Sequence, residues 1–168
     1  HKNIAVELLE KLLNDEVKSK FRTNVVKQRK FSDLLKNALT KYQNRSIEAA
    51  QVIAELIEMA KEFKNDIEKS NELNLNPAEN AFYDALSNNK SAEELMGEEV
   101  LIQIAREIAE KLRENVTVDW SVRESVRARL RLLVKNLLRK YKYPPDQQAE
   151  ATELVLSQAE VISEELVA

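Results

Sequence analysis

Basic side chains are concentrated in one short segment of the chain, and their spacing suits contact with phosphate groups. Between Ser121 and Lys142 there are eight Lys or Arg residues and a single acidic residue, Glu124, which gives the segment a charge of +7. Five of the basic residues recur every four positions: Arg123, Arg127, Arg131, Lys135 and Arg139. Closely spaced cations release condensed counterions when they meet a polyanion. The row is therefore a candidate site for direct, non-specific contact with DNA phosphates.

Acidic residues near the end of the chain offer a second explanation for the same row. The segment after the Pro144-Pro145 corner contains no basic residue and six acidic ones: Asp146, Glu150, Glu153, Glu160, Glu164 and Glu165. An antiparallel hairpin across this corner would place acids beside bases, and the pairing would set the register of the helices more than their stability. A third interpretation is that the arginines hold a polyphosphate such as ATP, because guanidinium groups match phosphate oxygens.

A second group of acidic residues lies in the middle of the chain and has two interpretations. It is a docking surface for a basic partner, or it is an ordinary solvated helix face. Its members are Glu93, Glu94, Glu98, Glu99, Glu107 and Glu110.

The chain lacks the residues that most catalytic sites require. It has no Cys, its one Gly is Gly97, and its one His is His1, which we interpret as a tag remnant or as a cut point in a longer protein. Thiol chemistry and glycine-rich phosphate loops are thereby excluded. Carboxylates are plentiful, but without His or Cys they lack the usual partners of zinc and di-iron sites. We expect no catalytic residue, no metal site and no cofactor in these 168 residues.

The elements that carry these residues are predicted to be helices. The chain contains three Pro and one Gly, and its apolar residues, 43% of the total, recur at helical spacing. We therefore predict an all-α bundle of about six to seven helices, forming a single domain over residues 1–168, with the last two helices as an antiparallel hairpin. In the first half of the chain, helices are expected over residues 3–22, over residues 25–42 with a bend near Ser32, and from residue 46 onward. A further helix is expected from residue 77 onward, followed by a single turn that begins after Ser91 and ends at Gly97. The last helices are expected over residues 98–114, over residues 121–141 and from residue 146 to the end.

Local sequence signals support several of these boundaries. Capping boxes are expected at Asn76-Pro77-Ala78-Glu79, Ser91-Ala92-Glu93-Glu94 and Ser121-Val122-Arg123-Glu124. Trp120 is expected to pack inward between two helices rather than to stack on a base or a partner. Two apolar faces are predicted, one on the first helix (Ile4, Leu8, Leu9, Leu12, Leu13) and one on the third (Ala49, Ile53, Leu56, Ala60, Phe63, Ile67).

The overall charge of the chain and its hydropathy limit its surroundings. The net charge is −3, which does not favour nucleic-acid binding by the chain as a whole. No apolar run approaches the roughly 20 residues that a membrane span needs, and no signal-peptide pattern opens the chain. We expect a cytoplasmic location without membrane contact.

Several strings of the sequence resemble a known family. They are Phe31-Ser32-Asp33-Leu34-Leu35, residues 41–48 (KYQNRSIE), residues 81–86 (AFYDAL), residues 115–120 (NVTVDW) followed by residues 123–128 (RESVRA), and Leu138-Arg139-Lys140-Tyr141 with the Pro-Pro-Asp corner. In order and spacing they resemble the C-terminal helical region of the R subunit of type I restriction enzymes. The resemblance covers most of the chain, but these strings mark a fold and not a catalytic constellation.

The resemblance implies a role within a larger enzyme. The intact proteins of this family are ATP-dependent type I site-specific deoxyribonucleases that use ATP and Mg²⁺ to translocate duplex DNA. Neither the phosphate-binding loop of a motor nor the acidic site of a nuclease can be read in this chain. The implied function is a non-catalytic assembly domain that docks the R subunit onto the methyltransferase and specificity subunits, with duplex DNA as a further partner.

Overall fold

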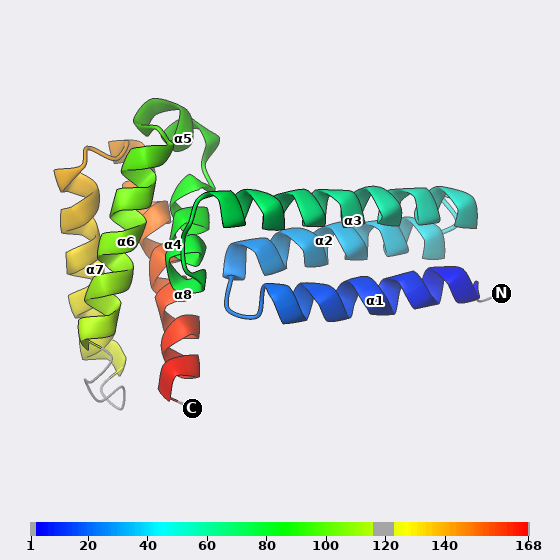
Figure 1. Ribbon diagram of the computed structural model, residues 1–168, viewed down its shortest axis with the longest axis horizontal. Helices are drawn as coiled ribbons and strands as arrows, with labels where there is room; N and C mark the ends of the chain where they lie inside the picture. Colours follow the sequence, from blue (N-terminus) through cyan, green and yellow to red (C-terminus); the bar gives the residue numbers. More distant parts are fainter. Residues whose placement is uncertain (1–2, 116–122, 168) are drawn as a thin grey trace. The chain divides into compact units, whose positions relative to one another are not determined.

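The structure is a computed structural model that describes residues 3–115 and 123–167, with side-chain detail for residues 3–115 and 124–164. The described residues form eight α-helices and a short 3₁₀ helix (Figure 1). This confirms the predicted all-α class. The chain divides into two compact units, residues 1–22 with 27–74 and residues 23–26 with 75–168. That the chain is one domain stays a prediction.

The first unit contains α1 (Ile4–Lys20), most of α2 (Val25–Gln43) and α3 (Ala49–Glu72). Three phenylalanines lie at the centre of its core. The rings of Phe21 and Phe31 stack with their centroids 5.6 Å apart, and Phe63 meets both edge-on at 5.1 and 5.3 Å. Stacked and edge-to-face pairs of this kind add to the free energy gained by burying the rings. These contacts join α2, α3 and the C-terminal end of α1.

Two expectations for the first unit need correction. Of the apolar face predicted for α1, Leu13 is buried and Leu9 packs against the core, but Ile4, Leu8 and Leu12 are exposed. The side of the helix that faces the core is formed by Val6, Leu13 and Val17. The bend predicted near Ser32 is also not present, since α2 is one helix from Val25 to Gln43 and Ser32 is exposed on it.

The apolar face predicted for α3 is confirmed, although the helix begins later than expected. Leu56 and Phe63 are buried, and the other predicted members are partly buried and pack against the same core: Ala49, Ile53, Ala60 and Ile67. The helix starts at Ala49 rather than Ser46, because Glu48 and Gln51 form a capping box there. Gln51 accepts a hydrogen bond from the Glu48 backbone at 2.9 Å.

A cluster of charges joins α2 to α3 beside this core. Asp66 of α3 accepts hydrogen bonds from Lys27 at 3.1 Å and from Lys30 at 2.8 Å, and Lys30 also pairs with Glu62 at 2.9 Å. Partial burial alone would raise the pKa of Asp66, but the hydrogen bond from Lys30 and the charge of Lys27 outweigh it and hold that pKa below its ordinary value. Asp66 is therefore ionised at neutral pH and stabilises the folded state.

The second unit is built around α4 (Pro77–Ser87), which packs against both α6 (Glu98–Asn115) and α8 (Gln148–Val167). Six consecutive residues of α4, from Ala81 to Leu86, are buried. The short α5 (Lys90–Met96) contacts α4 and α6, and α7 (Arg123–Lys140) contacts α6 and α8. Because α4 is covered on all sides, most of its surface contributes to the core and little of it is available to a partner.

Two of the three predicted caps can be compared with the structure. The capping box at Asn76 and Glu79 is confirmed, with reciprocal side-chain to backbone hydrogen bonds of 3.0 and 2.8 Å. The box predicted at Ser91 is wrong, because Asn89 caps α5 and accepts from the Ser91 backbone at 3.0 Å. Gly97 ends α5 as expected, with a φ of 85° that suits glycine. The box at Ser121 and the packing of Trp120 lie outside the described residues.

The proline corner joins α7 to α8 as an antiparallel hairpin, which confirms the prediction. Pro145–Gln147 forms the 3₁₀ helix η2 between them. Tyr143 precedes the corner, is 1% exposed, and donates a hydrogen bond from its hydroxyl to the Leu86 carbonyl of α4 at 2.7 Å. Burial raises the pKa of Tyr143 to about 12, so the hydroxyl keeps the proton that this bond requires. The corner is thus fixed to the central helix of its unit.

A buried glutamine connects α8 to residues 23–26, which belong to the same unit. Gln158 is fully buried, accepts a hydrogen bond from the Val25 backbone N–H at 2.8 Å, and donates one to the Thr23 carbonyl. Val25 is the first residue of α2, where backbone N–H groups have no partner within the helix. The amide therefore satisfies a donor and an acceptor in a partly buried part of the fold.

We predict that Gln158→Leu, which keeps the side-chain volume, destabilises the protein. The Val25 N–H and the Thr23 carbonyl would lose their partner. A buried polar group left unsatisfied costs about 1–3 kcal/mol, and because these two groups are only partly buried, the cost of each should lie near the lower end of that range. Urea unfolding followed by circular dichroism measures the loss. The exposed neighbour Ser157 gives the control, Ser157→Ala, for which little change is expected. Equal stability of Gln158→Leu and wild type would show that these two bonds contribute nothing.

We also predict a pH dependence that originates in Asp66. A lowered carboxyl pKa contributes stability that is present above the ordinary value of 3.8 and is lost as the pH falls through the lower folded-state value. Asp66→Asn should therefore lower the urea midpoint at pH 7, and this deficit should shrink as the pH falls below 4. The control is Asp33→Asn at an exposed site of α2. A deficit that stays constant down to pH 2.5 would contradict this assignment.

Candidate interaction surface of α7

The buried side of α7 fixes the direction of its basic side chains. Val126, Leu130, Val134 and Leu138 are each 5% exposed or less and form the side of the helix that packs into the core. Successive residues of an α-helix are about 100° apart, so residues four apart are displaced by about 40°. A row with a spacing of four thus turns by about 160° from Arg123 to Arg139. The five residues do not form one straight line of charge.

Two residues of the row, Arg127 and Arg131, face α8 and form ion pairs with its carboxylates. Arg127 pairs with Glu160 at 2.9 Å and with Glu153 at 3.6 Å, while Arg131 pairs with Glu153 at 3.0 Å. The hydrogen bond from Arg131 holds the pKa of Glu153 below its ordinary value, and the charges of Arg131, Arg127 and Lys135 act in the same direction. The acidic residues of α8 thus neutralise two of the predicted site residues.

The row then turns away from α8. Lys135 and Arg139 are exposed, and neither makes an ion pair within the described part of the chain. The side chain of Arg123 lies outside the described residues. The structure therefore separates the predicted row into a neutralised pair, Arg127 and Arg131, and an exposed pair, Lys135 and Arg139. Whether any of the five binds DNA or polyphosphate stays a prediction.

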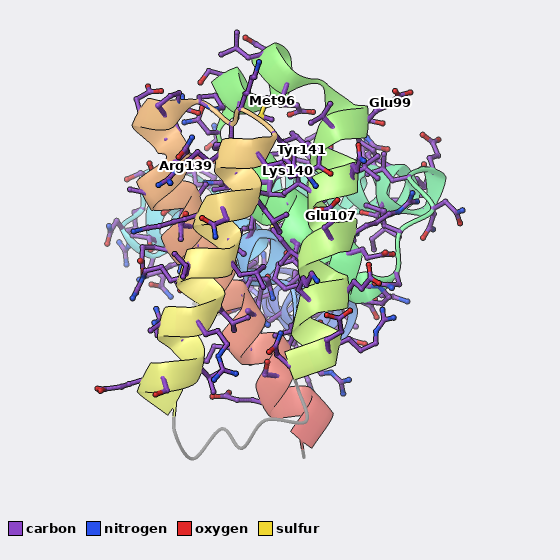
Figure 2. All side chains as sticks on the ribbon, turned by 90° about the vertical axis from the view of Figure 1, so that its left-hand side faces the viewer. Met96, Glu99, Glu107, Arg139, Lys140 and Tyr141 are labelled. Carbon is purple, nitrogen blue, oxygen red and sulfur yellow. The ribbon has the colours of Figure 1, made fainter. Side chains whose placement is uncertain are left out.

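On the other side of α7, a small polar cluster faces α6. The Tyr141 hydroxyl donates a 2.6 Å hydrogen bond to Glu107, and the Lys140 ammonium lies 3.9 Å from the same carboxylate. Its hydrogen bond to Glu107 raises the pKa of Tyr141, so the tyrosine remains protonated. Figure 2 shows Lys140 and Tyr141 between α7 and α6, with Arg139 on the opposite side of α7. Glu107 is thus engaged, while the proposed docking role of the wider acidic group stays a prediction.

Exposed basic residues outside the predicted row complete the outer surface of α7. Arg129, Lys140 and Lys142 are exposed, and Arg129 and Lys142 have no ion pair within residues 3–115 and 124–164. The sequence shows these residues in the basic segment. Arg129 and Lys140 are eleven positions apart and Lys140 and Lys142 are two apart, so they do not follow the spacing of four. A helical wheel finds them, because it orders residues by angle rather than by interval.

The first unit has a different kind of exposed surface, made of apolar side chains. Ile4, Leu8 and Leu12 of α1 are 81%, 55% and 52% exposed and lie one helical turn apart. We call these three residues the α1 stripe. The sequence predicts these residues on one apolar face together with Leu9 and Leu13, but only Leu9 and Leu13 pack against the core.

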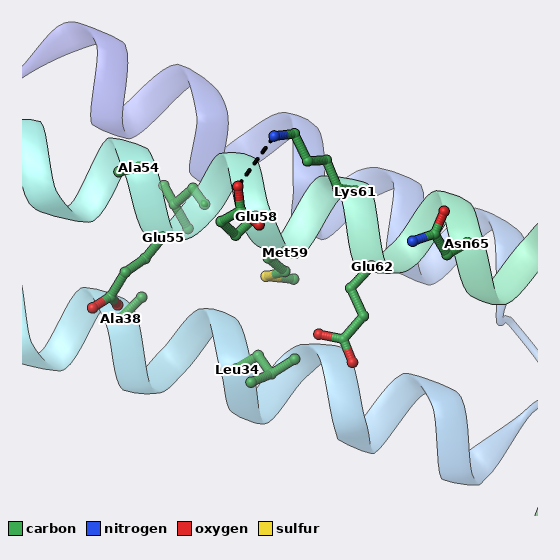
Figure 3. Close-up of a pocket in the computed structure, with 10 residues that line it drawn as sticks. Leu34, Ala38, Ala54, Glu55, Glu58, Met59, Lys61, Glu62 and Asn65 are labelled. Carbon is green, nitrogen blue, oxygen red and sulfur yellow. Dashed lines mark hydrogen bonds and ion pairs between the residues drawn. The ribbon is translucent and has the colours of Figure 1, made fainter.

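An open groove of about 620 Å³ lies between α2 and α3 in the same unit (Figure 3). Leu34, Ala38 and Met59 form part of its apolar base. Its three acidic side chains are each paired with a lysine, in the pairs Glu55–Lys41, Glu58–Lys61 and Glu62–Lys30. The charge at the rim of the groove is thus largely balanced within the unit.

The described residues show neither a cluster of potential metal ligands nor a helix suited to a membrane. Among residues 3–115 and 123–167, His, Asp and Glu side chains form no group of three or more that could hold a metal ion. Within the same ranges, none of the helices has the length and apolar character needed to cross a membrane.

Comparison with known proteins finds one family. The family model described as type I restriction enzyme HindI endonuclease subunit-like, C-terminal, matches residues 1–165. The type I restriction enzyme HindI endonuclease subunit of Haemophilus influenzae is 47% identical over 98% of this chain. A protein of Methanocaldococcus jannaschii, assigned by name as the MjaIXP endonuclease subunit of a type I restriction enzyme, is 30% identical over 83% of it. The chain spans 16% and 13% of the lengths of these two relatives. No solved structure matches.

We predict that the ion pairs between α7 and α8 favour the observed register of the two helices, because only this register places their opposite charges side by side. Arg131→Glu or Glu153→Arg alone brings like charges together and should lower stability by up to about 1 kcal/mol, as for other exposed pairs. The double variant should recover part of this loss. Arg129→Glu, which reverses an exposed charge without a partner, is the control. Urea unfolding gives the coupling free energy, and strictly additive effects of the two substitutions would contradict the pairing.

Proposed function

Because the chain belongs to the family of C-terminal regions of type I restriction enzyme endonuclease subunits, we propose that it is a non-catalytic assembly domain. Its task in this proposal is to dock the endonuclease subunit onto the methyltransferase–specificity core. The partner follows from the family, because an endonuclease subunit acts beside the other subunits of its restriction enzyme. The proposal concerns this part of the subunit and leaves DNA cleavage to the remainder of the protein.

The single observation that carries the proposal is the α1 stripe. Ile4, Leu8 and Leu12 follow one another at i, i+4 and i+8 and are each more than half exposed. Contiguous apolar surface with a polar rim is typical of protein–protein interfaces. Charged residues border this stripe, with Asp15 and Glu16 next along the helix and Lys11 beside it. An apolar face of a helix with such a rim fits the groove of another protein.

Burial of the stripe would supply binding free energy of the required order. Removing a leucine or isoleucine side chain from water is favourable by about 1.5–3 kcal/mol. Three such residues exceed the contribution of several exposed ion pairs, which add about 0–1 kcal/mol each. The apolar stripe is therefore a better anchor for a stable subunit contact than the charges around it.

We predict that Leu8→Glu with Leu12→Glu strongly weakens binding to the methyltransferase–specificity complex. The measurement is retention of that purified complex by the immobilised 168-residue chain, with a loss in affinity of at least tenfold expected. The matched control is Ile57→Glu with Leu95→Glu, which changes two other exposed aliphatic residues in the same way. Circular dichroism establishes that both variants are folded.

Two results would overturn the proposal. One is failure of the wild-type chain to retain the complex at micromolar concentration. The other is equal loss in the stripe variant and in the control, because binding would then depend on net charge and not on the α1 stripe.

A further inference from the structure

The outer face of α7 is a surface of positive charge that the second unit leaves uncovered. Its cations are Arg129, Lys135, Arg139 and Lys140, with Lys142 directly after the helix, and all five are exposed. No Asp or Glu occurs between Glu124 and Asp146. We call these five residues the α7 cationic face. It differs from the predicted row, since it contains neither Arg127 nor Arg131.

The neighbouring helices neutralise only the edges of α7. The carboxylates of α8 reach Arg127 and Arg131, and Glu107 of α6 reaches Lys140 at 3.9 Å. Arg129, Lys135, Arg139 and Lys142 have no ion pair within the described residues, and Lys135 acts on Glu153 only at longer range. Cations left without a counterion repel one another, so an external polyanion relieves that repulsion on binding.

The shape of the face also permits close approach of a second macromolecule. Arg129 and Lys140 lie on one side of the helix, and Lys135 and Arg139 lie about 100–120° round the axis from them. Within this stretch, the exposed residues between the two columns are Asn136, which is short, and Leu132, which is 62% exposed. From Arg129 to Arg139 the face extends about 15 Å along the helix axis. Figure 2 views this side of the second unit, with α7 in front.

We propose that the α7 cationic face binds duplex DNA through its phosphates, without sequence preference. Duplex DNA carries one negative charge per about 1.7 Å of its axis, so it presents phosphates to every cation of a 15 Å face in any register. An acidic protein would have to match the two columns with carboxylates at fixed positions. Exposed arginines and lysines on a helix without intervening acids are the contact type expected for the DNA backbone rather than for base edges.

The proposal predicts salt-dependent binding of moderate strength. With about four phosphates neutralised, the affinity should fall about 100-fold between 50 and 200 mM salt. The net charge of −3 opposes binding by the rest of the chain, so measurement should begin at low salt. The measurement is fluorescence anisotropy of a labelled 20-base-pair duplex titrated with the 168-residue chain, in about 20 mM salt, where screening is weak.

Two pairs of variants separate this face from general electrostatics. Lys135→Glu with Arg139→Glu should weaken binding at least tenfold, whereas Lys36→Glu with Lys64→Glu, an equal change of charge at exposed sites of α2 and α3, should have a much smaller effect. Arg129→Ala should weaken binding more than Arg131→Ala, because Glu153 already neutralises Arg131. Circular dichroism confirms that each variant is folded.

The outcomes are decisive in either direction. The proposal is supported if DNA binding is weakened by Lys135→Glu with Arg139→Glu and by Arg129→Ala. Lys36→Glu with Lys64→Glu and Arg131→Ala, the two controls, should then bind DNA much as the wild type does. The proposal is overturned by absence of wild-type binding in 20 mM salt, by equal loss in the α2 and α3 control, or by Arg131→Ala being as harmful as Arg129→Ala. Displacement of the duplex by polyglutamate at equal charge concentration would also overturn it and assign the face to an acidic protein.

Discussion

The angle between successive residues of a helix decides which charges of the second unit remain available to a partner. Buried Val126, Leu130, Val134 and Leu138 fix the rotation of α7, and every other side chain of the helix then has its direction assigned. Carboxylates of α8 occupy one flank and Glu107 of α6 occupies the other. What is left is a face between the two neighbours, which contains cations but no acid. The uncovered charge is thus a consequence of core packing and not of a separate binding motif.

Ion pairs on the surface are not what stabilises this unit. Exposed pairs contribute about 0–1 kcal/mol each, whereas full burial of a large apolar side chain contributes about 1.5–3 kcal/mol. The strong connections are internal: six consecutive buried residues of α4, the bond from Tyr143 to the Leu86 carbonyl, and the two bonds of Gln158. Because the core supplies the stability, charges on the outer face of α7 can vary with little effect on folding, and binding requirements can then determine them.

Features that depend on neighbouring residues can be predicted from the sequence, whereas features that depend on other helices are predicted less accurately. The cap at Asn76 is confirmed because Pro77 and Glu79 act within one turn. The cap at Ser91 is wrong because Asn89, two residues earlier, competes for the same start. For α1 the predicted face included Leu13 of the core but missed Val6 and Val17, and it also included three residues that are exposed, because their direction depends on where α3 lies. Likewise the basic residues of α7 were all counted, whereas their division into neutralised and exposed sets required the position of Glu153.

The two proposed surfaces differ in physical character, and this difference suits them to different tasks. The affinity of an apolar stripe such as that of α1 depends little on salt, which would suit the subunit contact that we propose for it. A cationic face on a chain of net charge −3 binds weakly and is sensitive to salt, and the acidic residues elsewhere repel DNA. In the role that we propose, such a face would orient a duplex held by other parts of a restriction enzyme, because phosphates are attracted to one side of α7 and repelled by the acids elsewhere on the chain. Weak binding of DNA by the α7 cationic face would be an advantage in that role. A DNA contact that is repeatedly broken and remade should be weaker than the subunit contact that we propose for the α1 stripe.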